Sequence, residues 1–131
     1  MASSSLPDFL IIGAQKAGTT ALKDTLAMHL AVYMAKGSIG LGDEIHFFSN
    51  QWTRGVDWYR QHFMHPEKLQ GEKSPSYLRR VICHRRMHEI VPRAKLLVLL
   101  RNPVSRAYSQ WNHFNKLHRQ GEGFQSWREL P

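Results

Sequence analysis

The chain has 131 residues, of which 42% are hydrophobic, and this length and composition predict about one globular domain. A formal net charge of +8 predicts a polyanionic partner, such as a nucleotide, a nucleic acid, a sulfated or phosphorylated ligand or a membrane surface, without choosing among them. The single cysteine, Cys83, excludes an internal disulfide, and no apolar run approaches the roughly 18 residues of a transmembrane helix.

The first residues carry no targeting signal that the sequence reveals. Residues 1–7 are predicted to form a flexible N-terminus, and residues 8–131 a single domain. The N-terminus lacks the basic flank and the long apolar core of a signal peptide. We therefore expect a cytoplasmic protein without a membrane partner.

A buried strand followed by a glycine-bounded loop opens the domain. Residues 9–12 predict the strand, and residues 18–30 predict a helix with Leu22, Leu26 and Leu30 on one face. Between them the chain reads Gly-Ala-Gln-Lys-Ala-Gly-Thr-Thr. Such a loop can bind phosphate, because its backbone N–H groups and the positive end of the helix dipole converge on one anion.

The order of residues in this loop differs from that of nucleotide triphosphatases. Their loop places Lys directly after the second glycine. Here Thr19 follows Gly18, and the only lysine of the loop, Lys16, comes two positions earlier. We therefore expect a phosphate-binding loop that is not built for ordinary Mg-ATP chemistry.

The middle of the chain alternates short strands, loops and helices. Periodicity and turn residues predict a short strand at residues 32–34 and a glycine-rich loop at 36–43. Helical turns are predicted at 56–63, and an amphipathic helix at 78–91, which Pro92 ends. The continuous apolar run 96–100 predicts a strand covered on both faces.

The last helix is predicted to begin at Pro103, with Asn102 as its N-cap and an apolar stripe over Val104, Ala107, Tyr108, Trp111 and Phe114. Strands and helices that alternate in this way predict an α/β fold. The expected architecture is a P-loop-like, three-layer α/β/α arrangement around a central parallel sheet.

A second candidate site follows the predicted strand at residues 96–100. Arg101 lies at the carboxyl end of that strand, where open α/β sheets bind their ligands, and Ser109 lies about two helical turns further on. Together they could hold a second phosphate, through the guanidinium fork and the hydroxyl. Alternatively, Arg101 pairs with a carboxylate and Ser109 is simply solvated.

Five motifs in order resemble one family. They are Gly-x-x-Lys-x-Gly-Thr-Thr after a strand, Glu-x-His-Phe-Phe from Glu44, Trp-Tyr-Arg from Trp58, Glu-Lys-Ser-Pro-x-Tyr from Glu72, and Leu-Arg-Asn-Pro-x-x-Arg-x-x-Ser from Leu100. This series resembles the PAPS-dependent sulfotransferases, and among them most resembles the heparan-sulfate-type group and its bacterial relatives. The motifs cover residues 8–115.

The resemblance implies a role for each matching residue. The donor's 5′-phosphosulfate would be bound by the loop residues Gln15, Lys16, Ala17, Gly18, Thr19 and Thr20, and its 3′-phosphate by Arg101 and Ser109. Lys16 would neutralise charge on the departing phosphate, and Lys73 would lie near the sulfuryl group. Glu44 would act as general base on a hydroxyl or amine acceptor, for which a glycan is one candidate. The implied donor is PAPS, the product is PAP, and no metal is required.

The sequence departs from the family pattern at two points. Asp43 precedes Glu44 where relatives carry a lysine, for which Lys36 is a candidate replacement, and the chain is shorter than family domains usually are. Residues 8–131 therefore correspond to the N-terminal part of a sulfotransferase domain. An incomplete domain would expose apolar sheet edges and helix faces, so we expect self-association. Burial would raise the pKa of Glu44 and a nearby lysine would lower it, a balance that the sequence leaves open.

Two other functions fit parts of the pattern. A kinase or NTPase variant would bind Mg-ATP, but the loop lacks the Gly-Lys-Ser/Thr sequence. A basic nucleic-acid-binding module would fit the charge, but no DNA- or RNA-binding motif with interleaved aromatic residues is present, and nucleic acid is not expected as a partner. His84 and His88 lie four apart on a predicted helix, yet Arg85 and Arg86 between them disfavour a metal.

Overall fold

The computed structural model describes residues 5–37 and 42–119 of the chain. Its sheet contains the strands β1 (Phe9–Gly13), β2 (Val32–Met34), β3 (Leu69–Lys73) and β4 (Lys95–Val98). All neighbouring pairs are parallel, and the order across the sheet is β2-β3-β1-β4. The helices are α1 (Thr19–Ala27), α2 (Val56–Arg60), α3 (Val81–Ile90) and α4 (Pro103–Arg119), with a short 3₁₀ turn η1 at Trp52–Arg54.

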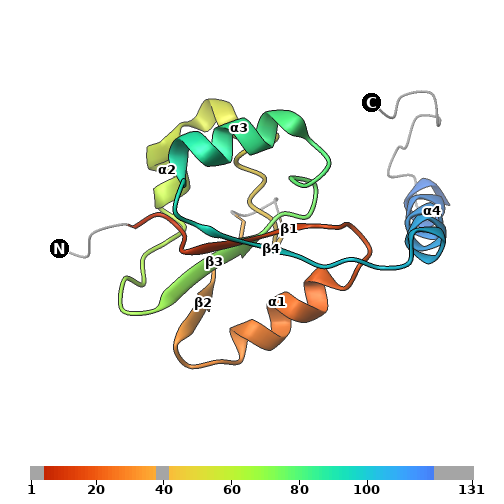
Figure 1. The fold of residues 1–131 in the computed structure, drawn as a ribbon, viewed down its shortest axis with the longest axis horizontal. Coiled ribbons are helices and arrows are strands. Elements are labelled where there is room, and N and C mark those ends of the chain that lie inside the picture. The colour runs from red at the N-terminus through yellow and green to blue at the C-terminus, as the bar shows by residue number, and fades with distance from the viewer. Residues whose placement is uncertain (1–4, 38–41, 120–131) are drawn as a thin grey trace.

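The elements form three layers. Figure 1 shows α1 on one side of the sheet, α2 and α3 on the other, and α4 beyond the end of β4. Because strand side chains alternate between the two faces, Leu10 and Ile12 of β1 join the core beneath α3, while Phe9 and Ile11 pack with Met34 against α1. This arrangement confirms the α/β class with a central parallel sheet.

The third strand was not predicted from the sequence. β3 reads Leu-Gln-Gly-Glu-Lys, a polar stretch without the apolar alternation of a strand, yet it lies next to β1 and four of its five residues are buried. Its polar groups are buried with hydrogen-bond partners: the backbone N–H of Gln70 donates to Asp8 Oδ2 at 2.8 Å, and Gln70 Oε1 accepts from the backbone of His65 at 2.9 Å. Such pairing removes the cost of burying polar side chains.

The first helix is shorter than predicted. α1 ends at Ala27 rather than residue 30, because the chain must turn to enter β2 at Val32. Leu22 and Leu26 pack against the core as expected, but Leu30 is 91% exposed. The helix over residues 78–91 is likewise confined to Val81–Ile90.

The expectation that β4 is covered on both faces is wrong for the described residues. β4 is the edge strand, bonded only to β1 within the described sheet. Leu97 packs against the α1-side cluster, whereas Leu96 and Val98 are 51% and 43% exposed on the other face. These exposed apolar groups are the feature on which the expectation of self-association rests.

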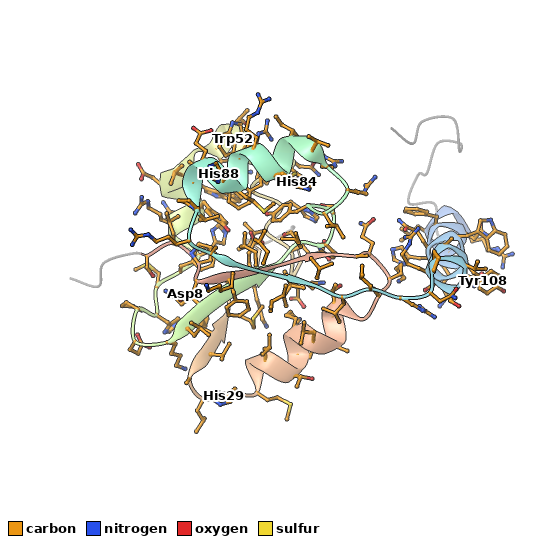
Figure 2. All side chains as sticks on the ribbon, viewed as in Figure 1. Asp8, His29, Trp52, His84, His88 and Tyr108 are labelled. Carbon is orange, nitrogen blue, oxygen red and sulfur yellow. The ribbon has the colours of Figure 1, made fainter. Side chains whose placement is uncertain are left out.

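The final helix begins at Pro103, as the sequence predicts. Asn102 Oδ1 accepts hydrogen bonds from the backbone N–H groups of Val104 and Ser105, at 3.1 and 3.2 Å, which satisfies two of the free donors of the helix terminus. Its apolar stripe does not face the sheet: Tyr108 is 63% exposed and points away from the body of the protein in Figure 2.

Two further expectations concern the N-terminal residues and helices that could cross a membrane. Residues 1–4 of the predicted flexible N-terminus lie outside the described residues, but Ser5 donates its backbone N–H to Phe63 O at 3.3 Å and Leu6 packs on the core, so residues 5–7 are attached to the domain. None of the helices in the described ranges has both the length and the apolar character needed to cross a bilayer.

Candidate active site

A cavity of about 480 Å³ lies where β1, β3 and β4 end and where α1 and α4 begin. Every site residue singled out from the sequence except Ala17 contributes to its wall: Gln15, Lys16, Gly18, Thr19, Thr20, Glu44, Lys73, Arg101 and Ser109. This is the carboxyl edge of a parallel sheet, the edge at which α/β folds bind ligands. The topology therefore brings together residues that are up to 94 positions apart in the sequence.

The phosphate loop is fastened to the end of β4. The backbone N–H of Ala14 donates to Leu99 O at 2.9 Å, and the N–H of Leu99 donates to Gly13 O at 2.8 Å. Gly18 has a φ of 96° directly before α1, a left-handed conformation that glycine adopts without steric cost. No side chain caps the first turn of α1, and no acidic residue lies in it, so its N–H groups are available to an anion.

Arg101 and Lys16, the basic residues of the two predicted phosphate sites, are joined through the side chain of one and the backbone of the other. Arg101 Nη1 donates to the backbone carbonyl of Lys16 at 3.0 Å, and both residues line the same cavity. Within the described ranges Arg101 forms no ion pair with a carboxylate, so the alternative of a purely structural ion pair finds no support there. Ser109 is half-buried on the cavity wall.

Glu44 is held between two basic side chains. Lys73 Nζ donates to Glu44 Oε1 at 2.9 Å and to Thr20 Oγ1 at 3.2 Å, while His46 Nε2 lies 2.9 Å from Glu44 Oε2. Burial alone would raise the pKa of Glu44, but the hydrogen bonds from His46 and Lys73 together outweigh it and lower that pKa. Glu44 is therefore ionised at neutral pH and able to accept a proton.

A buried carboxylate behind the cavity fixes the segment that carries Glu44. Glu72 Oε1 accepts from the hydroxyls of Tyr59 and Tyr77 at 2.8 and 2.9 Å, and Oε2 accepts from Ser74 Oγ at 2.8 Å. The same Ser74 oxygen accepts the backbone N–H of His46 at 3.1 Å. Burial raises the pKa of Glu72, although these hydroxyl hydrogen bonds oppose the rise.

Lys36 does not act as the replacement that the sequence suggests for a lysine directly before Glu44. Its side chain is exposed, and the partners of Glu44 are Lys73 and His46. Asp43 instead forms an ion pair with Lys23 of α1 at 2.6 Å. The neighbours of Glu44 in the described ranges are therefore Lys73 and His46 rather than Lys36.

Several residues of the site were not singled out from the sequence. Gln110 and His113 line the cavity beside Ser109, and the amide of Gln110 donates to Gln15 Oε1 at 3.1 Å. A signal for His113 existed, because a residue four positions after Ser109 lies on the same side of a helix, whereas Gln110, one position after Ser109, had none. His46 stands inside the quoted Glu-x-His-Phe-Phe motif, and its contact with Glu44 depends on a left-handed backbone conformation, φ 55°, that the motif does not reveal.

Metal binding finds no positive indication in the described ranges, where no group of three or more His, Cys, Asp or Glu residues is placed to hold an ion. His84 and His88 lie along α3 (Figure 2), and His84 Nε2 lies 2.9 Å from Leu78 O.

The cavity thus combines an uncapped helix terminus, basic side chains and a carboxylate at the carboxyl edge of a parallel sheet. The sulfotransferase domain family matches residues 6–130, and the chain therefore belongs to the sulfotransferase family.

Curated relatives of the chain include two bifunctional heparan sulfate N-deacetylase/N-sulfotransferases. Enzyme 1 of Caenorhabditis briggsae is 44% identical over 106 residues, which are 80% of this chain and 12% of that protein. Enzyme 2 of Homo sapiens is 40% identical over 113 residues, 82% of this chain and 13% of that protein. The chain thus spans about an eighth of the length of these relatives.

A solved structure shares the fold. The sulfotransferase from Alicyclobacillus acidocaldarius superposes with a TM-score of 0.74 at 33% identity, covering 95% of this chain and 55% of that one. The family and this neighbour confirm the resemblance and the fold class, and the family implies PAPS as the sulfate donor.

Proposed function

We propose that this chain carries the donor-binding and proton-accepting part of a sulfotransferase that moves the sulfuryl group of PAPS to a hydroxyl or amine of a carbohydrate. The observation that carries the proposal is the single cavity lined by Lys16, Glu44, Lys73 and Arg101. The names of the curated relatives refer to heparan sulfate and to N-sulfotransferase activity, which supports a glycan acceptor and, in particular, an amine.

The donor has two anionic ends, and the cavity offers two cationic regions for them. The loop over residues 15–20 and the uncapped first turn of α1 would bind the 5′-phosphosulfate. Arg101 and Ser109 would bind the 3′-phosphate, Arg101 through its planar fork of donors. The hydrogen bond from Arg101 to the Lys16 carbonyl holds these regions at a fixed separation.

Sulfuryl transfer resembles phosphoryl transfer, in which charge spreads onto the leaving and equatorial oxygens. The protein's contribution is then to position the reactants and to present fixed positive charge. Lys16 would face the leaving phosphate oxygen, and Lys73 would face the sulfuryl oxygens. Lys73 is well placed for this because Thr20 and Glu44 hold its buried ammonium at the cavity wall.

Glu44 would remove the proton from the acceptor nucleophile. Its lowered pKa keeps it ionised at neutral pH, and one of its oxygens would exchange the contact with Lys73 or His46 for the acceptor's N–H or O–H. Such a base would speed the transfer, because a sugar hydroxyl or a protonated amine is a poor nucleophile until its proton is removed.

A calorimetric titration with PAP, AMP and Mg-ATP tests the donor site. PAP should bind about 10- to 100-fold more tightly than AMP, since charge-assisted hydrogen bonds to the 3′-phosphate contribute about 1.5–3 kcal/mol. Arg101→Gln should abolish this preference, whereas the matched variant Arg85→Gln on the exposed face of α3 should keep it. Equal affinity for PAP and AMP refutes the donor assignment; tight Mg-ATP binding would favour a kinase or NTPase variant.

A second experiment tests the base. Glu44→Gln should retain PAP affinity but lower transfer from ³⁵S-labelled PAPS to de-N-sulfated heparin by about 10²- to 10⁴-fold, the usual contribution of a general base. Unchanged turnover would remove Glu44 from this role. An oligonucleotide titrated at low and high salt serves as the control for a nucleic-acid-binding module, which predicts steep loss of binding with salt.

A further inference from the structure

Lys23 is a buried lysine that the donor site does not use. It lies on α1, its side chain is only 8% exposed, and it does not line the cavity. Its ammonium lies 2.6 Å from Asp43 Oδ2 and 2.9 Å from Asp24 Oδ1. Lysine is rarely buried unless it is paired, so the burial of Lys23 depends on these two carboxylates.

The pair connects α1 to the residue directly before Glu44. Thr20 lies in the first turn of the same helix, three residues before Lys23, and accepts a hydrogen bond from Lys73. Two consecutive residues are therefore anchored in two directions: Asp43 to α1 through Lys23, and Glu44 to β3 through Lys73. The segment that carries Glu44 is in this way attached to both α1 and β3.

We propose that Lys23 is a positioning residue, which through Asp43 holds Glu44 at the cavity and offsets the negative charge that Asp43 brings next to it. This inference rests on the proposed role of Glu44 as the base. Lys23 itself touches neither the donor nor the acceptor.

The charges around the two carboxylates define what the loss of Lys23 would do. Glu44 faces Lys73 from β3 and His46 from its own segment. Asp43 faces Lys23 from α1, while Lys36 and Lys73 act on it from farther away, and the hydrogen bond from Lys23 is the main reason that the pKa of Asp43 is lowered. Hydrogen bonds to Asp24 and Asp43 raise the pKa of Lys23, and the one to Asp24 is the largest single cause.

Two variants that break the same contact test whether Lys23 offsets the charge of Asp43, because each removes one member of the ion pair. Lys23→Met leaves the charge of Asp43 uncompensated beside Glu44, so the pKa of Glu44 should rise, because a neighbouring negative charge disfavours the ionised carboxylate. Asp43→Asn removes that negative neighbour, so the same pKa should fall or stay. A contact that only stabilises the fold would move both in the same direction.

The measurement is a carboxyl-carbon NMR titration of Glu44, which needs no acceptor and no turnover. The double variant Lys23→Met/Asp43→Asn should return the pKa of Glu44 to the parent value. Asp24→Asn, which keeps the Lys23–Asp43 contact, is the matched control and should change it least. Thermal unfolding of each variant shows whether the protein is folded at the temperature of the titration.

Kinetics with PAPS and de-N-sulfated heparin supply the second readout. Lys23→Met and Asp43→Asn should each lower kcat about tenfold, because a displaced catalytic group loses much of its effect, while PAP affinity changes less than twofold. Lys23→Arg, which can still pair with Asp43, should restore most of the loss. An unshifted Glu44 titration in folded Lys23→Met overturns the inference and leaves the base role standing, which Glu44→Gln tests by itself.

Discussion

The buried carboxylate of Glu72 supports one side of the active site, and its removal should be costly. Three hydroxyl groups donate to it, those of Tyr59, Tyr77 and Ser74, and the carboxylate has no exposed surface. In Glu72→Ala these donors lose their acceptor inside the protein. Each buried polar group left without a partner costs about 1–3 kcal/mol, so the variant should lose at least about 3 kcal/mol.

Glu72→Gln is the milder change and separates charge from hydrogen bonding. Its carbonyl oxygen can still accept from Tyr59 and Tyr77, while its amide group faces Ser74 and loses that single bond, at a cost of about 1 kcal/mol. Because Ser74 also accepts the backbone N–H of His46, the disturbance extends to the partner of Glu44.

Urea unfolding followed by tryptophan fluorescence measures both variants. With a slope of about 1–3 kcal/mol per molar urea, a loss of 3 kcal/mol lowers the midpoint by at least about 1 M, and Glu72→Gln should lie between this variant and the parent. Glu67→Gln, an exposed glutamate, is the control. A midpoint for Glu72→Ala within 0.3 M of the parent, an order-of-magnitude limit of about 1 kcal/mol, would refute the reasoning.

The pH dependence gives an independent check of the same carboxylate. Burial raises the pKa of Glu72 in the folded protein above its ordinary value of 4.5. The folded protein therefore holds this proton more tightly than the unfolded chain, and the contribution of Glu72 to stability falls as pH rises from 4.5 through the raised pKa. Glu72→Gln has no such group, so the stability advantage of the parent over Glu72→Gln should shrink with rising pH.

Three shorter predictions concern single residues. Lys73→Met should raise the pKa of Glu44, seen by the same NMR titration, because the burial of Glu44 persists while one of its two hydrogen-bond donors is lost; an unchanged pKa would contradict the assigned contact. Gly71→Ala should destabilise the domain by about 1–3 kcal/mol in urea unfolding, since the new Cβ would lie 2.3 Å from the Phe9 ring in a packed core. Asn102→Ala should cost about 1 kcal/mol through loss of the α4 cap, and full stability would show that the cap is dispensable.

Local features were predicted well wherever the residues that cause them lie within a few positions of one another in the chain. The apolar run at residues 9–12 predicts burial in a core, and β1 is buried throughout. Asn102 followed by Pro103 combines a capping side chain with a fixed φ, and α4 starts there. The order of glycines around Lys16 is also local, and it places a loop at the end of β1.

The edge position of β4 could not be predicted in the same way. A run of five apolar residues indicates burial but does not say how many neighbours the strand has or which faces they cover. β3 was missed for the opposite reason. The side chains of Gln70 and Glu72 are buried only because they find hydrogen-bond partners, such as Ser5 and Tyr59, that lie outside the strand. Neither outcome is encoded within the strand itself.

The amino-acid sequence by itself determined the class of fold and the family, because these depend on residue types at fixed spacings along the chain. Only the tertiary structure decided the ionisation of Glu44 and the anchoring of its neighbour Asp43 by Lys23. A pKa depends on the balance between burial and the groups close by, which for Glu44 are Lys73 of β3 and His46 of the segment after it. Their distances are set by how the sheet and helices pack, which no stretch of sequence states alone.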